Sequence, residues 1–460
     1  MKQKINNHLA RLPAEIKVDG VISHAHCQEL RISFPAPKER ICPKCGSSYC
    51  VIKDSGRERT VRHIPSGKTG TLLTFRHRRY LCKDCHSTYY EPIYWLHPGS
   101  AVTENLFLDI FSDLNSALSI RNIALNNCVT ESIVMSVMNT IRIEKPTILP
   151  ETLCIDEFCG ETGTYNPETK RWDIEKFHCI LANGRSGAVV DILPRRDKAS
   201  LVRYFKSIPL HVRQRVKFCC VDMSGSFISM ARDCFPSAQI CVDLFHVVKN
   251  LNEMVRDVRI RVQHELIDAD PVNGKKTAQA LQKMNRILTT AERNQNLYWK
   301  QHKEKNLARL QAALALSPDL EEAYDALQAF HRILDLNEFL LQRADMTTWF
   351  NNYHHSEVPE ISAKIGKLRH YRSYIQNSMK YGKSNSTAEG RNRAIKEIKR
   401  NSYGNHSFEN FRKRILLAYG PVRFSKETYT IFDEKRQTEA AKAKIKNACS
   451  TSATPGGTES

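Results

Sequence analysis

The stretch from residue 152 to residue 243 decides the fold class, because it contains five short apolar runs. The runs read TLCIDEFCG (152–160), FHCILAN (177–183), GAVVDIL (187–193), VKFCCVD (216–222) and QICVD (239–243). The motif GRSG, which joins the second run to the third, predicts a hairpin. Helical patterns at about 197–208, 224–234 and 244–262 follow the third, fourth and fifth runs. Three strands in a meander, followed by two strands that alternate with helices, predict an α/β fold with a mixed sheet and helix cover.

Beyond these runs, the chain changes to an all-helical pattern. Strand signals disappear over 263–375, and the clearest helix start combines Ser317 as N-cap with Pro318 at the first helical position. A basic helical region follows from about residue 376. The last residues, from about 436, are rich in Ala and Lys and end in STSATPGGTES, so we expect a disordered tail.

The composition indicates a soluble, basic protein. Of the 460 residues, 41% are apolar and 26% are charged, as in ordinary globular proteins. The net charge of +20, from 69 Lys and Arg against 49 Asp and Glu, favours an acidic partner such as nucleic acid. The apolar stretches are shorter than the roughly 18 residues that a membrane span needs, and the N-terminus has no signal-peptide pattern. We therefore expect a cytoplasmic protein without a membrane partner.

Two cysteine pairs near the N-terminus predict a zinc site. The pairs form two CxxC motifs, Cys42 with Cys45 and Cys82 with Cys85. Such motifs can place four thiolates around one Zn²⁺ ion, and the stretch between them reads as short strands of a zinc ribbon. The 15 cysteines do not indicate a disulfide scaffold, because the number is odd, the chain is large and an export signal is missing. The alternatives are chance pairing of free cysteines and replacement of one ligand by Cys50, His77 or His86.

Residues 103–141 predict two helices joined by a turn. The first helix is expected to run to about Ala124, and the turn falls at Asn126 and Asn127. Thr130 can cap the second helix. This is the pattern of a helix-turn-helix, whose second helix can lie in the major groove of DNA. Because two short helices with a turn are common, a small linker bundle is the alternative.

Acidic residues end two of the predicted strands. Asp156 lies in the first apolar run, and Asp222 closes the fourth. A buried carboxylate without a partner is costly, and two carboxylates side by side repel each other unless a cation lies between them. Oxygen ligands of this kind suit Mg²⁺ or Mn²⁺. Helix capping is the commoner role for a strand-end Asp, and Glu389, near the start of a predicted helix, can simply complement the helix dipole.

Taken together, these motifs resemble the DDE transposases of bacterial insertion sequences, in the ISL3 branch. The resemblance covers about 40–425 and includes the CxxC motifs, Asp156 and Trp349. It also includes VDMSGSF around Asp222, VDLFHVVKNLN from Val242, SNSTAEGRNRAIKEIKR (384–400) and NSYGNHSFENFRKRILL (401–417). The last of these motifs is long and highly specific, and none of the motifs is broken.

The resemblance implies an RNase H-like catalytic domain in which Asp156, Asp222 and Glu389 are catalytic and bind Mg²⁺ or Mn²⁺. It implies cleavage of a DNA strand at the element end and transfer of the 3′ end to target DNA by two-metal chemistry. The implied partners are double-stranded DNA and further copies of the chain, as a dimer or larger oligomer, associated with the nucleoid. The alternatives are an inactive or domesticated transposase that acts as a DNA-binding regulator, and an RNase H-like nuclease without strand transfer.

On this basis we expect six segments. They are an N-terminal region (1–100) with a zinc ribbon (42–85), a helix-turn-helix segment (101–146), the first part of the RNase H-like core (147–262), an all-helical insertion (263–375), the last core helices with the Glu (376–435) and a disordered tail (436–460).

Basic residues are expected to contact DNA in two places. The first set precedes the second CxxC motif and comprises Arg76, Arg78 and Arg79. The second set lies on the helix with Glu389 and comprises Arg391, Arg393, Lys396, Lys399 and Arg400, with Arg412, Lys413 and Arg414 beyond it. Phosphate contacts of this kind give affinity rather than sequence choice, so we expect end recognition in the zinc ribbon and the helix-turn-helix. A solvated charged face is the alternative for any single member.

Five further side chains lie close to the acidic motifs. Glu157 is expected to point to the strand face opposite its neighbouring aspartate. Asp243 is expected to cap a helix or support the site, and His246 to lie at its edge. Asp191 and Asp197 are expected to be structural.

Overall fold

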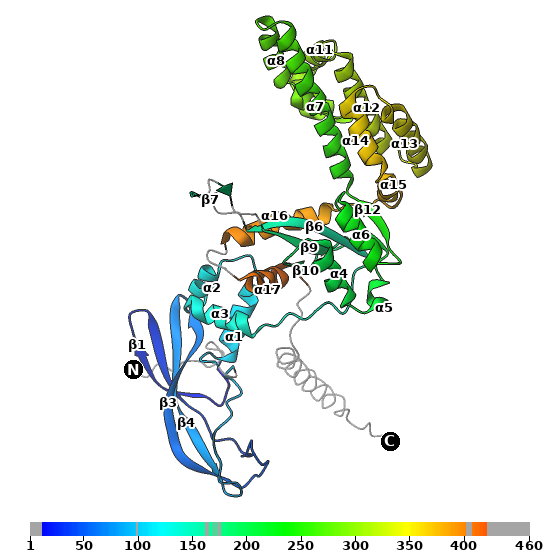
Figure 1. Cartoon of the computed structure of the whole chain (residues 1–460). Helices are drawn as coiled ribbons and strands as arrows, with labels where there is room; N and C mark the ends of the chain where they lie inside the picture. Colours follow the sequence, from blue (N-terminus) through cyan, green and yellow to red (C-terminus); the bar gives the residue numbers. More distant parts are fainter. Residues whose placement is uncertain are drawn as a thin grey trace, which may run out of the picture. The chain divides into compact units, whose positions relative to one another are not determined.

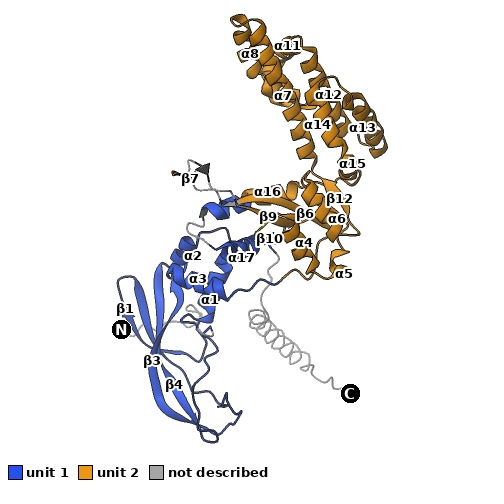
Figure 2. Cartoon of the chain, in the orientation of Figure 1, with its two compact units in different colours: residues 1–144, 394–460 blue, residues 145–393 orange. Residues whose placement is uncertain are grey.

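The computed structural model describes residues 12–97, 100–161, 165–168, 171–172, 176–401 and 407–420. The chain divides into two compact units, shown in separate colours in Figure 2. Unit 1 comprises residues 1–144 and 394–460, and unit 2 comprises residues 145–393. The expected disordered tail, 436–460, lies outside the described residues. Each described helix is too short or too polar to span a membrane.

Unit 1 begins with a five-stranded sheet (Figure 1). Its strands are β1 (Lys17–Ser23), β2 (Cys27–Ser33), β3 (Cys50–Ser66), β4 (Thr69–Cys82) and β5 (Thr88–Tyr90). The order is β1-β2-β4-β3 with β5 on β4, and only β2 and β4 pair in parallel. The expectation of short strands between the cysteine motifs is wrong, because β3 and β4 form one long hairpin. Gly67 turns this hairpin at a φ of +64°, which glycine adopts without strain.

Three helices follow the sheet in unit 1. They are α1 (Glu104–Leu114), α2 (Ile120–Asn126) and α3 (Glu131–Thr140). The expectation of a single first helix reaching Ala124 is wrong, because α1 ends at Leu114 and Ser119 caps the start of a new helix. The hydroxyl of Ser119 accepts the amide of Asn122 at 3.1 Å, which satisfies a free amide of the first turn. The helix after Thr130 begins as predicted.

The last described helix, α17 (Phe408–Tyr419), packs with these three helices in one apolar core. Its Arg414 is 2% exposed. The guanidinium donates to carbonyls at the end of α1 and in the loop after it, those of Leu114, Ser116 and Leu118. The expectation that Arg414 belongs to a DNA-facing track is therefore wrong, because its donors are used to satisfy backbone carbonyls.

Unit 2 is built on a mixed five-stranded sheet, as predicted (Figure 1). Its strands are β6 (Thr152–Glu161), β9 (Lys176–Asn183), β10 (Val189–Leu193), β11 (Phe218–Val221) and β12 (Gln239–Val242). The order is β10-β9-β6-β11-β12, in which the first three form an antiparallel meander and the last two run parallel to β6. A two-stranded ribbon of β7 (Tyr165–Asn166) and β8 (Arg171–Trp172) lies between β6 and β9 in the sequence.

Helices connect the later strands of this sheet. They are α4 (Lys198–Lys206) and α5 (Leu210–Arg213) before β11, and α6 (Gly225–Cys234) before β12. Asp197 caps α4 through the amide of Ser200. The helical patterns predicted after the third, fourth and fifth apolar runs are therefore confirmed.

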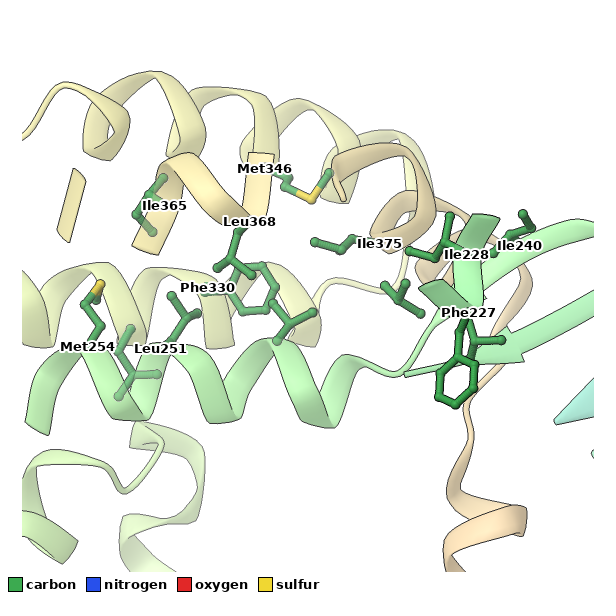
Figure 3. Close-up of a cluster of buried hydrophobic side chains, with 14 of the residues drawn as sticks. Phe227, Ile228, Ile240, Leu251, Met254, Phe330, Met346, Ile365, Leu368 and Ile375 are labelled. Atoms are coloured by element: carbon green, nitrogen blue, oxygen red, sulfur yellow. The ribbon is translucent and has the colours of Figure 1, made fainter. Parts of the chain in front are cut away.

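A helical region follows β12. It contains α7 (Leu244–Ala269), α8 (Asn273–Gln282), α9 (Asn285–Leu288), α10 (Glu292–Trp299), the short 3₁₀ helix η1 (Lys300–His302), α11 (Lys303–Leu314), α12 (Pro318–Asp335), α13 (Phe339–His354), α14 (Pro359–Arg369) and α15 (Arg372–Tyr381). Pro318 begins α12 after Ser317, as predicted. Figure 3 shows Leu251, Phe330 and Leu368 within the apolar cluster that α7, α12 and α14 share. The helix α16 (Ser386–Asn401) then returns to the sheet.

Candidate functional site

Asp156 and Asp222 lie side by side where β11 ends. Val221, the last residue of β11, pairs with Ile155 of β6, and in each case the next residue in the sequence is an aspartate. Asp156 is 7% exposed, whereas Asp222 is only half-buried. The parallel pairing of β6 and β11 therefore brings two distant acids to one edge of the sheet.

The helix α16 brings Glu389 to the same place. Glu389 lies in the first turn of α16 and is half-buried. Its charge contributes to the raised pKa of Asp156, as does the charge of Asp222. The three acids singled out in the sequence are thus neighbours in unit 2.

Two asparagines that the sequence analysis missed hold the aspartates in place. Asn385 is fully buried and donates to Oδ1 of Asp222 at 3.2 Å. Asn392 is also buried and donates to Oδ2 of Asp156 at 2.6 Å. Asn385 lies directly before α16, and Asn385, Glu389 and Asn392 are spaced i, i+4 and i+7, so all three lie on one side of the helix. That spacing was the available signal in the sequence.

Asp243 and His246 add two more side chains that can bind a metal. Asp243 follows β12 and caps α7, with its Oδ1 accepting the amide of Phe245 at 3.2 Å. His246, in the first turn of α7, places Nε2 3.3 Å from Oδ1 of Asp222. One ligand atom from each of Asp243, His246 and Glu389 lies within 4.8 Å of the other two. The cap role expected for Asp243 is confirmed, and His246 contacts the acids directly.

Burial raises the pKa values of three of these acids, Asp156, Asp243 and Glu389. Burial, followed by the charge of Asp222, raises the pKa of Asp156 from its usual value near 4 to about 7. Burial is also the first cause that raises the pKa of Asp243 and of Glu389. A divalent cation would relieve the repulsion and compete with the proton for these oxygens. The set of carboxylates and one imidazole therefore fits a divalent cation.

Three other acids near these motifs have structural contacts. Glu157 pairs with Arg196. Asp191 is fully buried and accepts the hydroxyl of Tyr204. The backbone amide of Ser200, in the first turn of α4, donates to the carboxylate of Asp197. This hydrogen bond lowers the pKa of Asp197 to about 2. The structural roles expected of Asp191 and Asp197 agree with these contacts.

Four cysteines gather at the open end of the β3–β4 hairpin in unit 1. The Sγ atoms of Cys42 and Cys85, and those of Cys45 and Cys82, are 3.6 Å apart, and all four lie within 4.8 Å of one another. Four sulfurs at about 2.3 Å from a central zinc ion would be about 3.8 Å apart, so the geometry fits a tetrahedral site. Hydrogen bonds from Ser87 lower the pKa of Cys85 to about 6, which favours the thiolate that zinc binds.

The substitute ligands considered from the sequence do not join this cluster. Among the described residues, the group comprises only the four cysteines of the CxxC motifs. Cys50 directs its Sγ to the carbonyl of Ser47 at 3.5 Å, and Nε2 of His77 lies 2.9 Å from the carbonyl oxygen of Glu91. The cluster therefore supports a zinc ion held by the two motifs.

The basic residues of β4 differ in their surroundings. Arg76 is exposed, whereas Arg78 pairs with Glu91 at 3.0 Å and is stacked on Phe34. Arg79 pairs with an acid of β3 at 3.2 Å. Arg76 is therefore the member of this set whose side chain is exposed to solvent.

The basic residues of α16 divide in a similar way. Arg393, Lys396 and Arg400 are exposed. Arg391 instead donates to the carbonyl of Gly187, and Lys399 is half-buried. Three members of the predicted set thus present their charges to solvent along one helix.

Two family models of known proteins match this chain, one over the zinc-ribbon region and one over most of the rest. The family model of ISL3-type DDE transposases, described as a transposase, matches residues 153–415, which is more than half of the chain. A second model, described as the zinc-finger of transposase IS204/IS1001/IS1096/IS1165, matches residues 38–85. The transposase for insertion sequence element IS1001 of Bordetella parapertussis is 24% identical over 389 residues, which cover 84% of this chain and 90% of that protein.

Proposed function

Because the chain belongs to the ISL3 family of DDE transposases, we propose that it binds the terminal repeats of an insertion sequence, cuts the DNA at the element ends and joins the cut 3′ ends to target DNA. The catalytic residues in this proposal are Asp156, Asp222 and Glu389, with Mg²⁺ or Mn²⁺ as cofactor. The observation that carries the proposal is the convergence of these carboxylates from β6, the end of β11 and α16. A protein that only binds DNA has no use for such a group beside a polyanion.

The reaction class is an in-line displacement at phosphorus. Divalent cations held by the three carboxylates would supply activation of the attacking oxygen and stabilisation of the leaving oxygen. The residues of the chain keep the ligands fixed, because Asn385 and Asn392 each donate to one aspartate. A covalent intermediate with the protein is not needed, so the same site can serve hydrolysis and then strand transfer.

We assign the sheet of unit 2 to the RNase H-like fold. The support is its strand order, with an antiparallel meander followed by two strands parallel to β6. In chain order, the acids fall on the first strand, after the fourth strand and on the helix that follows the helical region α7–α15. Each position agrees with the arrangement that the family resemblance implies.

We assign recognition of the element ends to unit 1. The zinc-ribbon match and the exposed Arg76 support a DNA-binding role for the sheet, and α2 and α3 form the proposed helix-turn-helix. The exposed residues of α3 include Ser132, Ser136 and Asn139, whose polar groups can read base edges. The exposed cations of α16 suit phosphates nearer the reaction. Pairing two element ends would require at least a dimer on DNA.

The direct test uses a linear duplex that ends in the terminal repeats flanking the gene. We expect the full-length protein to cut this DNA and join the 3′ end to a target duplex in Mg²⁺ or Mn²⁺, and EDTA to stop both steps. End-labelled products on a denaturing gel measure the reaction, and a duplex with scrambled repeats is the control. End binding without cutting in either metal would contradict the proposal and favour a regulator, whereas cutting without joining would favour a nuclease.

The asparagine contacts give a second prediction. Asn392→Ala removes the donor to Asp156, so we expect cleavage to fall about 10- to 100-fold, as for other groups that support metal ligands. The matched control is Asn377→Ala, which removes a comparable bond to the carbonyl of Ile240 without touching an acid. Cleavage rates and thermal unfolding are measured for both. Equal losses of activity in the two variants would show that Asn392 acts only through stability.

A further inference from the structure

A second group of metal-binding side chains adjoins the proposed catalytic acids. Asp243 comes from the end of β12, His246 from the first turn of α7 and Glu389 from α16. Their ligand atoms lie within 4.8 Å of one another. Two segments distant in the sequence, the start of α7 and the first turn of α16, thus bring two carboxylates and an imidazole together.

The helix-capping role of Asp243 gives a hydrogen-bond partner to only one of its two carboxylate oxygens. Its Oδ1 accepts the amide of Phe245 at 3.2 Å. Its Oδ2 is buried and has no hydrogen-bond partner in the part of the chain that the structure describes, and Asp243 as a whole is 4% exposed. A buried carboxylate oxygen without a donor or a cation is costly, so a helix cap alone does not account for this side chain.

The charge of the whole group also exceeds what one ion can balance. Asp156, Asp222, Asp243 and Glu389 carry four negative charges when ionised, and the strand pairing and side-chain contacts bring all four close together. One divalent cation neutralises half of this charge, and two neutralise all of it. The negative charge of the four carboxylates is therefore sufficient to bind a second divalent cation.

We propose that Asp243, His246 and Glu389 hold a divalent cation of their own, beside a first cation bound by Asp156 and Asp222. This inference rests on the proposed function. It divides the metal-binding side chains of the site between two cation positions. Nε2 of His246 lies 3.3 Å from Oδ1 of Asp222, so the two positions are adjacent. The imidazole ligand favours a transition metal such as Mn²⁺ over Mg²⁺ at the second position.

The test measures Mn²⁺ bound by the full-length, zinc-loaded protein without DNA. Electron paramagnetic resonance counts free Mn²⁺, and its pulsed form detects a nitrogen nucleus bound to the ion. We expect a nitrogen signal in the native protein. His246→Gln should remove that signal and weaken one bound Mn²⁺ by at least about tenfold. His264→Gln, an exposed histidine on the same helix, is the matched control and should change neither.

Two aspartate variants separate the positions. Asp243→Asn should weaken the second Mn²⁺, and it should keep α7 folded because asparagine is also a good N-cap. Asp156→Asn should weaken the first Mn²⁺ and preserve the nitrogen signal. Native protein that binds Mn²⁺ without a nitrogen signal, or an unchanged signal in His246→Gln, would overturn the inference. Failure of the proposed function is a separate result, namely protein that binds both ions and does not cut DNA.

Discussion

Asp222→Asn is expected to lower both strand cleavage and strand transfer by at least about 10³-fold. Asp222 follows β11 beside Asp156, and an amide cannot supply the negative charge that a divalent cation needs there. Metal stabilisation of a phosphoryl oxygen contributes several kcal/mol, and about 4 kcal/mol corresponds to roughly 10³-fold in rate. Binding of the terminal-repeat duplex should stay within about twofold, because we assign end recognition to unit 1. Labelled-end cleavage and gel-shift assays on the same protein preparation measure the two quantities.

The matched control for Asp222 is Asp197→Asn. Asp197 is an acid of the same unit that caps α4, and asparagine caps a helix equally well. This variant should cut and join at the native rate. Cleavage by Asp222→Asn at more than about a tenth of the native rate would show that Asp222 is not a catalytic ligand. Loss of end binding in the same variant would instead place Asp222 in DNA recognition.

The sheet of unit 2 could be predicted because its strands carry their own signals. β11 and β12 are short apolar runs buried at nearly every position, and each is followed by an aspartate. Parallel pairing of strands that end in this way brings their acids to one edge. Glu389 had no such signal, because an acid in the first turn of a helix is ordinary. Only the family resemblance selected it.

The supporting asparagines could not be found in the same way. Asn385 is 163 positions from Asp222, and Asn392 is 236 positions from Asp156. Their contacts arise when α16 packs against the sheet, so they depend on tertiary structure rather than on local pattern. Helical spacing can group them with Glu389, but it does not reveal what their amides contact.

Two predictions for unit 1, the length of the hairpin and the exposure of Arg414, are wrong for a related reason. β3 is largely exposed from residue 52 to residue 60, and its sequence KDSGRER lacks the alternation that marks a strand with one buried face. The hydropathy pattern therefore predicts a shorter hairpin than the one that the structure contains. Similarly, Arg414 is indistinguishable in sequence from the neighbouring Arg412 and Lys413, although its guanidinium is buried against α1 and its loop. A basic residue in the sequence predicts a positively charged surface only when its side chain is exposed to solvent.

Cys82→Ser is expected to remove the zinc ion and unfold the open end of the β3–β4 hairpin, where the four cysteines lie. Cys82 is fully buried, and its Sγ lies 3.6 Å from that of Cys45. A structural zinc ion contributes on the order of 10 kcal/mol, comparable with the net stability of a whole domain. End binding should weaken at least about tenfold, which needs a loss of only about 1.4 kcal/mol. Zinc content by atomic absorption, limited proteolysis and gel shift measure these effects.

Cys50→Ser is the control that separates zinc binding from packing. Cys50 is buried, pairs with Cys82 across the hairpin and lies outside the four-cysteine group. Its variant should keep one zinc ion per chain, because the tetrahedron of thiolates is intact. Equal zinc loss in both variants would show that the ligand set is wrong, and full zinc content in Cys82→Ser would refute the zinc site. Because unit 2 has a separate core, its fold should survive in either variant, so any loss of end binding in Cys82→Ser reports on unit 1.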